Sequence, residues 1–146
     1  MGEGQKLYAD AKSDCQTLVD FLLGFAVQQV NKRGSFLPFA AVLDTSGEVQ
    51  AHAAHPGPDP TTSSEVLPLF HEALRPLLAS GMRAVAVCEW VRFTPVGGHQ
   101  TDAAKVFVEH SNGLSVAFYL PMTKRFFGKW KTGELVVQPV QPEIGT

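Results

Sequence analysis

Two apolar runs, residues 105–110 and 114–120, are separated only by the tripeptide Ser-Asn-Gly at 111–113. Apolar runs joined by a short turn containing Asn-Gly predict a β-hairpin. A three-residue loop places Val108 opposite Val116 and keeps one face of the hairpin apolar, whereas a two-residue loop places a glutamate opposite Val116. The chain is therefore expected to contain an antiparallel sheet, with the three-residue loop setting the register of this hairpin.

The rest of the chain alternates between helical and strand patterns. Apolar residues at spacings of three and four predict a helix over 8–33, and a second helix is expected over 62–80. Apolar runs predict a second hairpin at 37–53, a strand at 82–93 and a short last strand at 134–137. We expect an α+β fold with an antiparallel sheet of about five or six strands, two helices packed on one face, and the order α-β-β-α-β-β-β(-β).

This order of elements resembles that of roadblock-type and profilin-like domains, except that the chain lacks the closing helix of the roadblock pattern. The resemblance implies a fold and no particular function, because these folds serve many roles. The 146 residues, 45% of them hydrophobic, suffice for one domain that buries roughly 70% of its unfolded surface. We expect a single α+β domain over 1–146, with terminal arms at 1–7 and 138–146.

Charge and composition restrict the environment and the ligands of the chain. A net charge of −2 gives no overall attraction to nucleic acid or to an anionic membrane. Two cysteines outside any CxxC motif indicate reduced, structural thiols. The first residues lack the apolar core of a signal peptide, and no apolar run has a membrane-spanning length, so a cytoplasmic protein is expected. The histidines do not follow a zinc-ligand spacing, and we expect no bound metal or cofactor.

No sequence motif for nucleophilic, phosphate-binding or dinucleotide-binding chemistry is present, but two carboxylates occur within apolar strands. Glu89 and Glu109 would be costly to bury unless they are paired, and a buried carboxylate with a raised pKa would suit a general acid or base. With Trp90 and Tyr119, they form a candidate ligand-binding set for a pocket between the second helix and the sheet. The alternative is that both carboxylates form structural ion pairs with basic residues on adjacent strands.

The segment that follows the main hairpin combines four positive charges with three large aromatic residues and no acid. Such a combination can bind single-stranded nucleic acid through phosphate contacts and base stacking, or rest on an anionic membrane surface. The structural alternative is a connecting segment whose aromatic rings close one end of the core while its cations stay in water. We call it the basic-aromatic segment; its members are Lys124, Arg125, Phe126, Phe127, Lys129, Trp130 and Lys131.

These features favour a non-catalytic protein-interaction or regulatory module that acts as a homodimer, rather than an enzyme. Edge strands and the exposed side of the first helix are the expected contact surfaces, with a second copy or another protein as the partner. A ligand-binding protein or enzyme with a pocket near Glu89 and Glu109 is the first alternative. Binding of single-stranded nucleic acid through residues 124–131 is the second, and the negative net charge makes nucleic acid the less favoured partner.

Overall fold

The computed structural model describes residues 3–52 and 63–145. Two helices and seven strands lie in these ranges, and they confirm the α+β class and the expected order of elements. The elements are α1 (Glu3–Arg33), β1 (Phe39–Leu43), β2 (Val49–His52), α2 (Ser63–Ala79), β3 (Ala84–Phe93), β4 (Thr101–His110), β5 (Ser115–Thr123), β6 (Lys131–Thr132) and β7 (Val136–Pro139).

All strand pairs of the described sheet are antiparallel, in the order β2-β1-β3-β4-β5-β6, and β7 also pairs with β5. The expected register of the main hairpin is confirmed, because Val108 pairs with Val116. Gly113 has a φ of 98°, the left-handed conformation that closes a three-residue hairpin loop. The described sheet has more strands than the five or six expected, because β6 and β7 both pair with the outer edge of β5.

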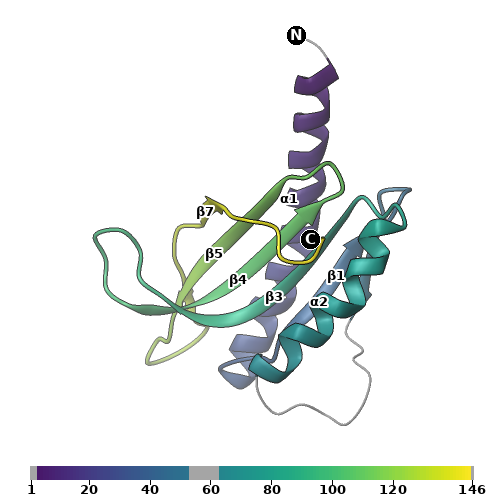
Figure 1. Ribbon diagram of the computed structural model, residues 1–146. Coiled ribbons are helices and arrows are strands. Elements are labelled where there is room, and N and C mark those ends of the chain that lie inside the picture. The colour runs from purple at the N-terminus through teal and green to yellow at the C-terminus, as the bar shows by residue number, and fades with distance from the viewer. Residues whose placement is uncertain (1–2, 53–62, 146) are drawn as a thin grey trace.

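The expectation that both helices pack on one face of the sheet is wrong. In Figure 1, α2 lies in front of the sheet and α1 lies behind it. The reason is visible in β3, where Ala86 and Cys88 belong to the core beneath α1, whereas Val85 and Val87 belong to the core beneath α2. Side chains alternate between the two faces of a strand, and a strand that is apolar on both faces requires a covering layer on each side.

Each face has its own buried core. On one side, α1 buries a stripe that includes Leu18, Leu22 and Ala26, each fully removed from solvent. On the other side, α2 contributes Phe70 and Leu74, and residues from the end of the chain complete the cover. The fold is thus a helix–sheet–helix sandwich in which the C-terminal segment shares one outer layer with α2 (Figure 1).

Both segments that were expected as terminal arms contain regular structure. Residues 3–7 are helical, because α1 begins at Glu3, and residues 1, 2 and 146 lie outside the described residues. At the other end, Gln138 and Pro139 belong to β7, and Ile144 is fully buried against Phe107 and the α2 side of the core. The C-terminal segment is therefore part of the packed structure.

Candidate functional site

The four candidate ligand-binding residues do not converge on one cavity. Glu89 forms an ion pair with Lys105 on the adjacent strand, at 3.5 Å, and the Lys105 ammonium lies 5.9 Å from the centre of the Tyr119 ring. These three residues follow one another across β3, β4 and β5. Trp90 lies on the opposite face, against the core beneath α1. Glu89 thus forms the structural ion pair with a basic residue on the adjacent strand that was the alternative to a ligand-binding role.

Glu109 lies further along β4, is only 3% exposed, and binds the end of the chain. Its carboxylate accepts backbone N–H groups from Glu143 at 2.8 Å, from Gly145 at 2.9 Å, and from Ile144. The guanidinium of Arg75 on α2 donates to the carbonyl oxygen of Ile144 at 2.8 Å. Charge-assisted bonds to three successive amides satisfy the carboxylate, so the role of Glu109 is to hold the C-terminal segment.

A cavity of about 280 Å³ lies beside this contact, between the end of α2 and the main hairpin. Arg75, Glu109, His110 and Pro142 are among the residues that line it, whereas Glu89, Trp90 and Tyr119 are not. Both oxygens of Glu109 already accept hydrogen bonds from the backbone of the C-terminal segment. The carboxylate that faces this cavity is therefore already used to bind the C-terminal segment.

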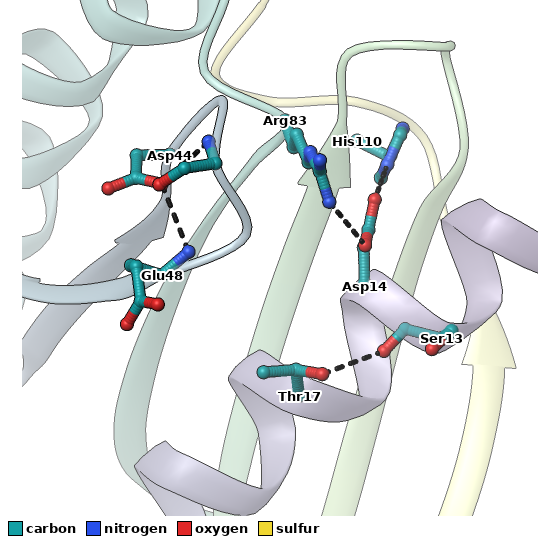
Figure 2. A network of polar contacts seen from close by, with 8 residues as sticks. Ser13, Asp14, Thr17, Asp44, Glu48, Arg83 and His110 are labelled. Carbon is teal, nitrogen blue, oxygen red and sulfur yellow. Dashed lines mark hydrogen bonds and ion pairs between the residues drawn. The ribbon is translucent and has the colours of Figure 1, made fainter.

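A polar contact that sequence reasoning missed joins α1 to the main hairpin (Figure 2). Nε2 of His110 lies 2.8 Å from a carboxylate oxygen of Asp14, and Arg83 approaches the second oxygen at 3.7 Å. The backbone N–H of Asn112 donates to Nδ1 of His110 at 3.1 Å, so Nε2 carries the proton that is donated to Asp14. With both ring nitrogens engaged, the pair orients the hairpin on α1.

The basic-aromatic segment divides into a packed end and an exposed tip. Trp130 is half-buried: its backbone N–H donates to the Asn31 side chain at 2.8 Å, and its ring meets Trp90 edge-on with centres 5.8 Å apart. Phe126 and Phe127, in contrast, are 93% and 80% exposed. Their rings are perpendicular, with centres 4.7 Å apart. The expectation that the aromatic rings of this segment close one end of the core therefore holds for Trp130. It does not hold for Phe126 and Phe127, which have no packing role.

The cations of the same segment are exposed and free of acidic partners in the described part of the chain. Arg83, Arg92 and Lys105, which lie elsewhere, each have a carboxylate within 4.0 Å. No described carboxylate lies within that distance of the four cations of the segment, which are Lys124, Arg125, Lys129 and Lys131. Their positive charge is available to an external anion.

A second apolar surface lies on the outer side of α1. Phe21 and Phe25, one helical turn apart, are 44% and 42% exposed. Phe25 also packs edge-on against Phe39 of β1, with ring centres 4.6 Å apart, which fixes one of the two rings. Gly24 lies beside them on the exposed side, and beyond its chain neighbours and the backbone of its own helix, a Cβ added there would meet nothing within 4 Å. Two phenylalanine rings and an open position thus form a continuous outward-facing surface, which we call the α1 face.

A comparison with known proteins finds no matching family model, no matching curated protein and no matching solved structure. Neither helix of the described residues is long and apolar enough to cross a membrane. Among the described residues, exposed phenylalanines occur in pairs at the α1 face and at the tip formed by Phe126 and Phe127, and Leu37, Val96 and Val137 are single exposed apolar side chains.

Proposed function

We propose that the chain is a non-catalytic protein-interaction module that acts as a homodimer through the α1 face. The observation that carries this proposal is the exposure of Phe21 and Phe25, side by side on a long helix. Large apolar side chains that gather on an otherwise polar helix surface are typical of protein contacts. A helix that presents such side chains outward can bury them against the same helix of a second copy.

A second copy fits this surface because a two-fold axis near Gly24 brings each phenylalanine pair against the other. The missing side chain at Gly24 leaves space beside the rings, into which a ring of the partner can pack. Charge supports an antiparallel arrangement, since Asp20 precedes the pair and Lys32 follows it along the helix. In that arrangement the part of α1 that contains Asp20 approaches the part of the partner helix that contains Lys32.

The contact is expected to be weak and dependent on concentration. Full burial of a phenylalanine contributes about 1.5–3 kcal/mol, and both rings of each copy are already partly covered in the monomer. Loss of free translation and rotation costs several kcal/mol on association. Dimer formation should therefore become complete only at high protein concentration, a regime suited to regulated assembly.

Sedimentation velocity over a wide range of concentration tests this proposal. The wild-type chain should change from monomer to dimer, and the double variant Phe21→Ser, Phe25→Ser should remain a monomer. The matched control is Phe126→Ser, Phe127→Ser, which also removes two exposed phenylalanines but leaves the α1 face intact. A wild-type monomer at every concentration, or an equal loss of dimer in the control, would refute the proposal.

A further inference from the structure

The tip formed by Phe126 and Phe127 has no explanation in the fold of the chain. At 93% and 80% exposure the two side chains bury almost nothing against the body, and within the described residues their aromatic contact is with each other. The tip belongs to the connection between β5 and β6, at the lower end of the sheet in Figure 1. Gly128, with a φ of 84°, turns the chain directly after the two rings. Two large apolar side chains are thus presented to the solvent on a turn.

Positive charge surrounds this tip on both sides. Lys124 and Arg125 precede the rings, and Lys129 and Lys131 follow them. All four side chains are exposed and have no described carboxylate within 4.0 Å. The packed Trp130 fixes the base of the segment through Asn31 of α1. Two exposed phenylalanines are thus flanked by four cations, on a segment that Trp130 attaches to the body of the protein.

We propose that this tip binds the surface of an anionic lipid bilayer. Phe126 and Phe127 enter the boundary between headgroups and acyl chains, and the four cations contact lipid phosphates and carboxylates. Aromatic rings are well suited to that boundary, and each Lys or Arg near an anionic surface adds to the binding. The bilayer site lies on a different segment from the α1 face, and it does not depend on dimer formation.

The geometry of the rings favours a bilayer over single-stranded nucleic acid. Binding of a strand by stacking requires aromatic faces that successive bases can cover. Phe126 and Phe127 are perpendicular and meet edge to face, so they do not present two parallel faces to neighbouring bases. The third aromatic residue of the segment, Trp130, is occupied by its contact with Trp90. Insertion into a lipid boundary, in contrast, needs exposed apolar volume and no stacking order.

Co-flotation with vesicles tests the proposal. The full chain should float with vesicles of phosphatidylcholine and phosphatidylserine, and not with vesicles of phosphatidylcholine alone. The variant Phe126→Ser, Phe127→Ser should reduce the partition coefficient about tenfold. Lys124→Gln and Lys129→Gln should each reduce it about fivefold. The matched control, Phe21→Ser, Phe25→Ser, should bind as the wild type does.

A second measurement reports on depth. In the variant Phe126→Trp, tryptophan fluorescence should be quenched by brominated acyl chains in the anionic vesicles, and the wild-type Trp90 and Trp130 supply the baseline. The proposal is refuted if the chain binds neutral and anionic vesicles equally or binds neither. Tight, salt-sensitive binding to an oligodeoxythymidine with no vesicle binding would likewise refute it and would assign the segment to nucleic acid.

Discussion

The carboxylate of Glu109, near the end of β4, accepts a hydrogen bond from the backbone N–H of Ile144. The side chain of Ile144 is fully buried on the α2 side of the sheet. The same carboxylate also binds the amides of Glu143 and Gly145. A polar contact and an apolar contact thus hold the C-terminal segment at adjacent points. Part of the stability of the sheet should depend on this segment, although it contains no regular structure after β7.

The variant Ile144→Ala tests the apolar half of that contact. The side chain is 0% exposed and packs with the core that includes Phe70 and Leu74, so truncation leaves a cavity. We expect a loss of about 2–5 kcal/mol in the free energy of unfolding. The measurement is equilibrium unfolding in urea, with Val137→Ala as the control. Val137 lies in β7 and is 54% exposed, so its truncation should have a much smaller effect, and equal effects would contradict the assigned role of Ile144.

The variant Glu109→Gln tests the polar half. In glutamine an NH₂ group, which can only donate hydrogen bonds, replaces one of the two carboxylate oxygens. At least one of the three backbone N–H groups therefore loses its acceptor. We expect a loss of about 1–3 kcal/mol in the free energy of unfolding, with faster proteolysis after β7. Glu134→Gln, an exposed change near β7, is the control and should leave both measurements unchanged. Unaltered proteolysis of Glu109→Gln would show that the carboxylate does not hold the segment.

The parts of the fold that sequence analysis predicts correctly are those set by local patterns. The register of the main hairpin follows from its loop length and its apolar face, and the structure confirms it. The apolar residues on both faces of β3 also indicate a central strand, which β3 is. Because these residues are apolar on both faces of β3, both faces must be covered. The placement of α1 and α2 on opposite faces could therefore have been predicted from the sequence.

Contacts between distant residues could not be predicted in this way. Asp14 and His110 are 96 positions apart, and neither belongs to a motif. The C-terminal segment has the composition of a loose arm, and it is held by two apolar side chains, Ile144 and Val140, and by backbone groups that any sequence possesses. Among the candidate site residues, alternation along the strand separates Trp90 from Glu89, although the two are adjacent in sequence.

The buried thiol of Cys15 gives a prediction about pH. Burial, and secondly the negative charge of Asp14, raise the pKa of Cys15 from 9.0 to about 11. The folded chain therefore holds this proton more tightly than the unfolded chain, and its contribution to stability is complete below pH 9 and is lost as the pH rises toward 11. Unfolding measured across that range should show a decline that is shallower in Cys15→Ala. A thiol reagent near neutral pH should modify Cys15 only after unfolding, and rapid modification of the native chain would contradict this.

Gly24 allows the stability of α1 to be separated from the association of two copies. A glycine on the exposed side of a helix lowers stability by about 1 kcal/mol relative to alanine, and a Cβ added at Gly24 meets nothing within 4 Å beyond its chain neighbours and the backbone of its own helix. Gly24→Ala and Gly24→Leu should therefore both raise the free energy of unfolding of the monomer, measured at low concentration. Only leucine fills the space beside Phe21 and Phe25, so Gly24→Leu should weaken the dimer in sedimentation more than Gly24→Ala does. If both variants are stabilised and both dimerise as the wild type does, the partner helix does not approach α1 at Gly24, and the two-fold contact has to lie elsewhere on the chain.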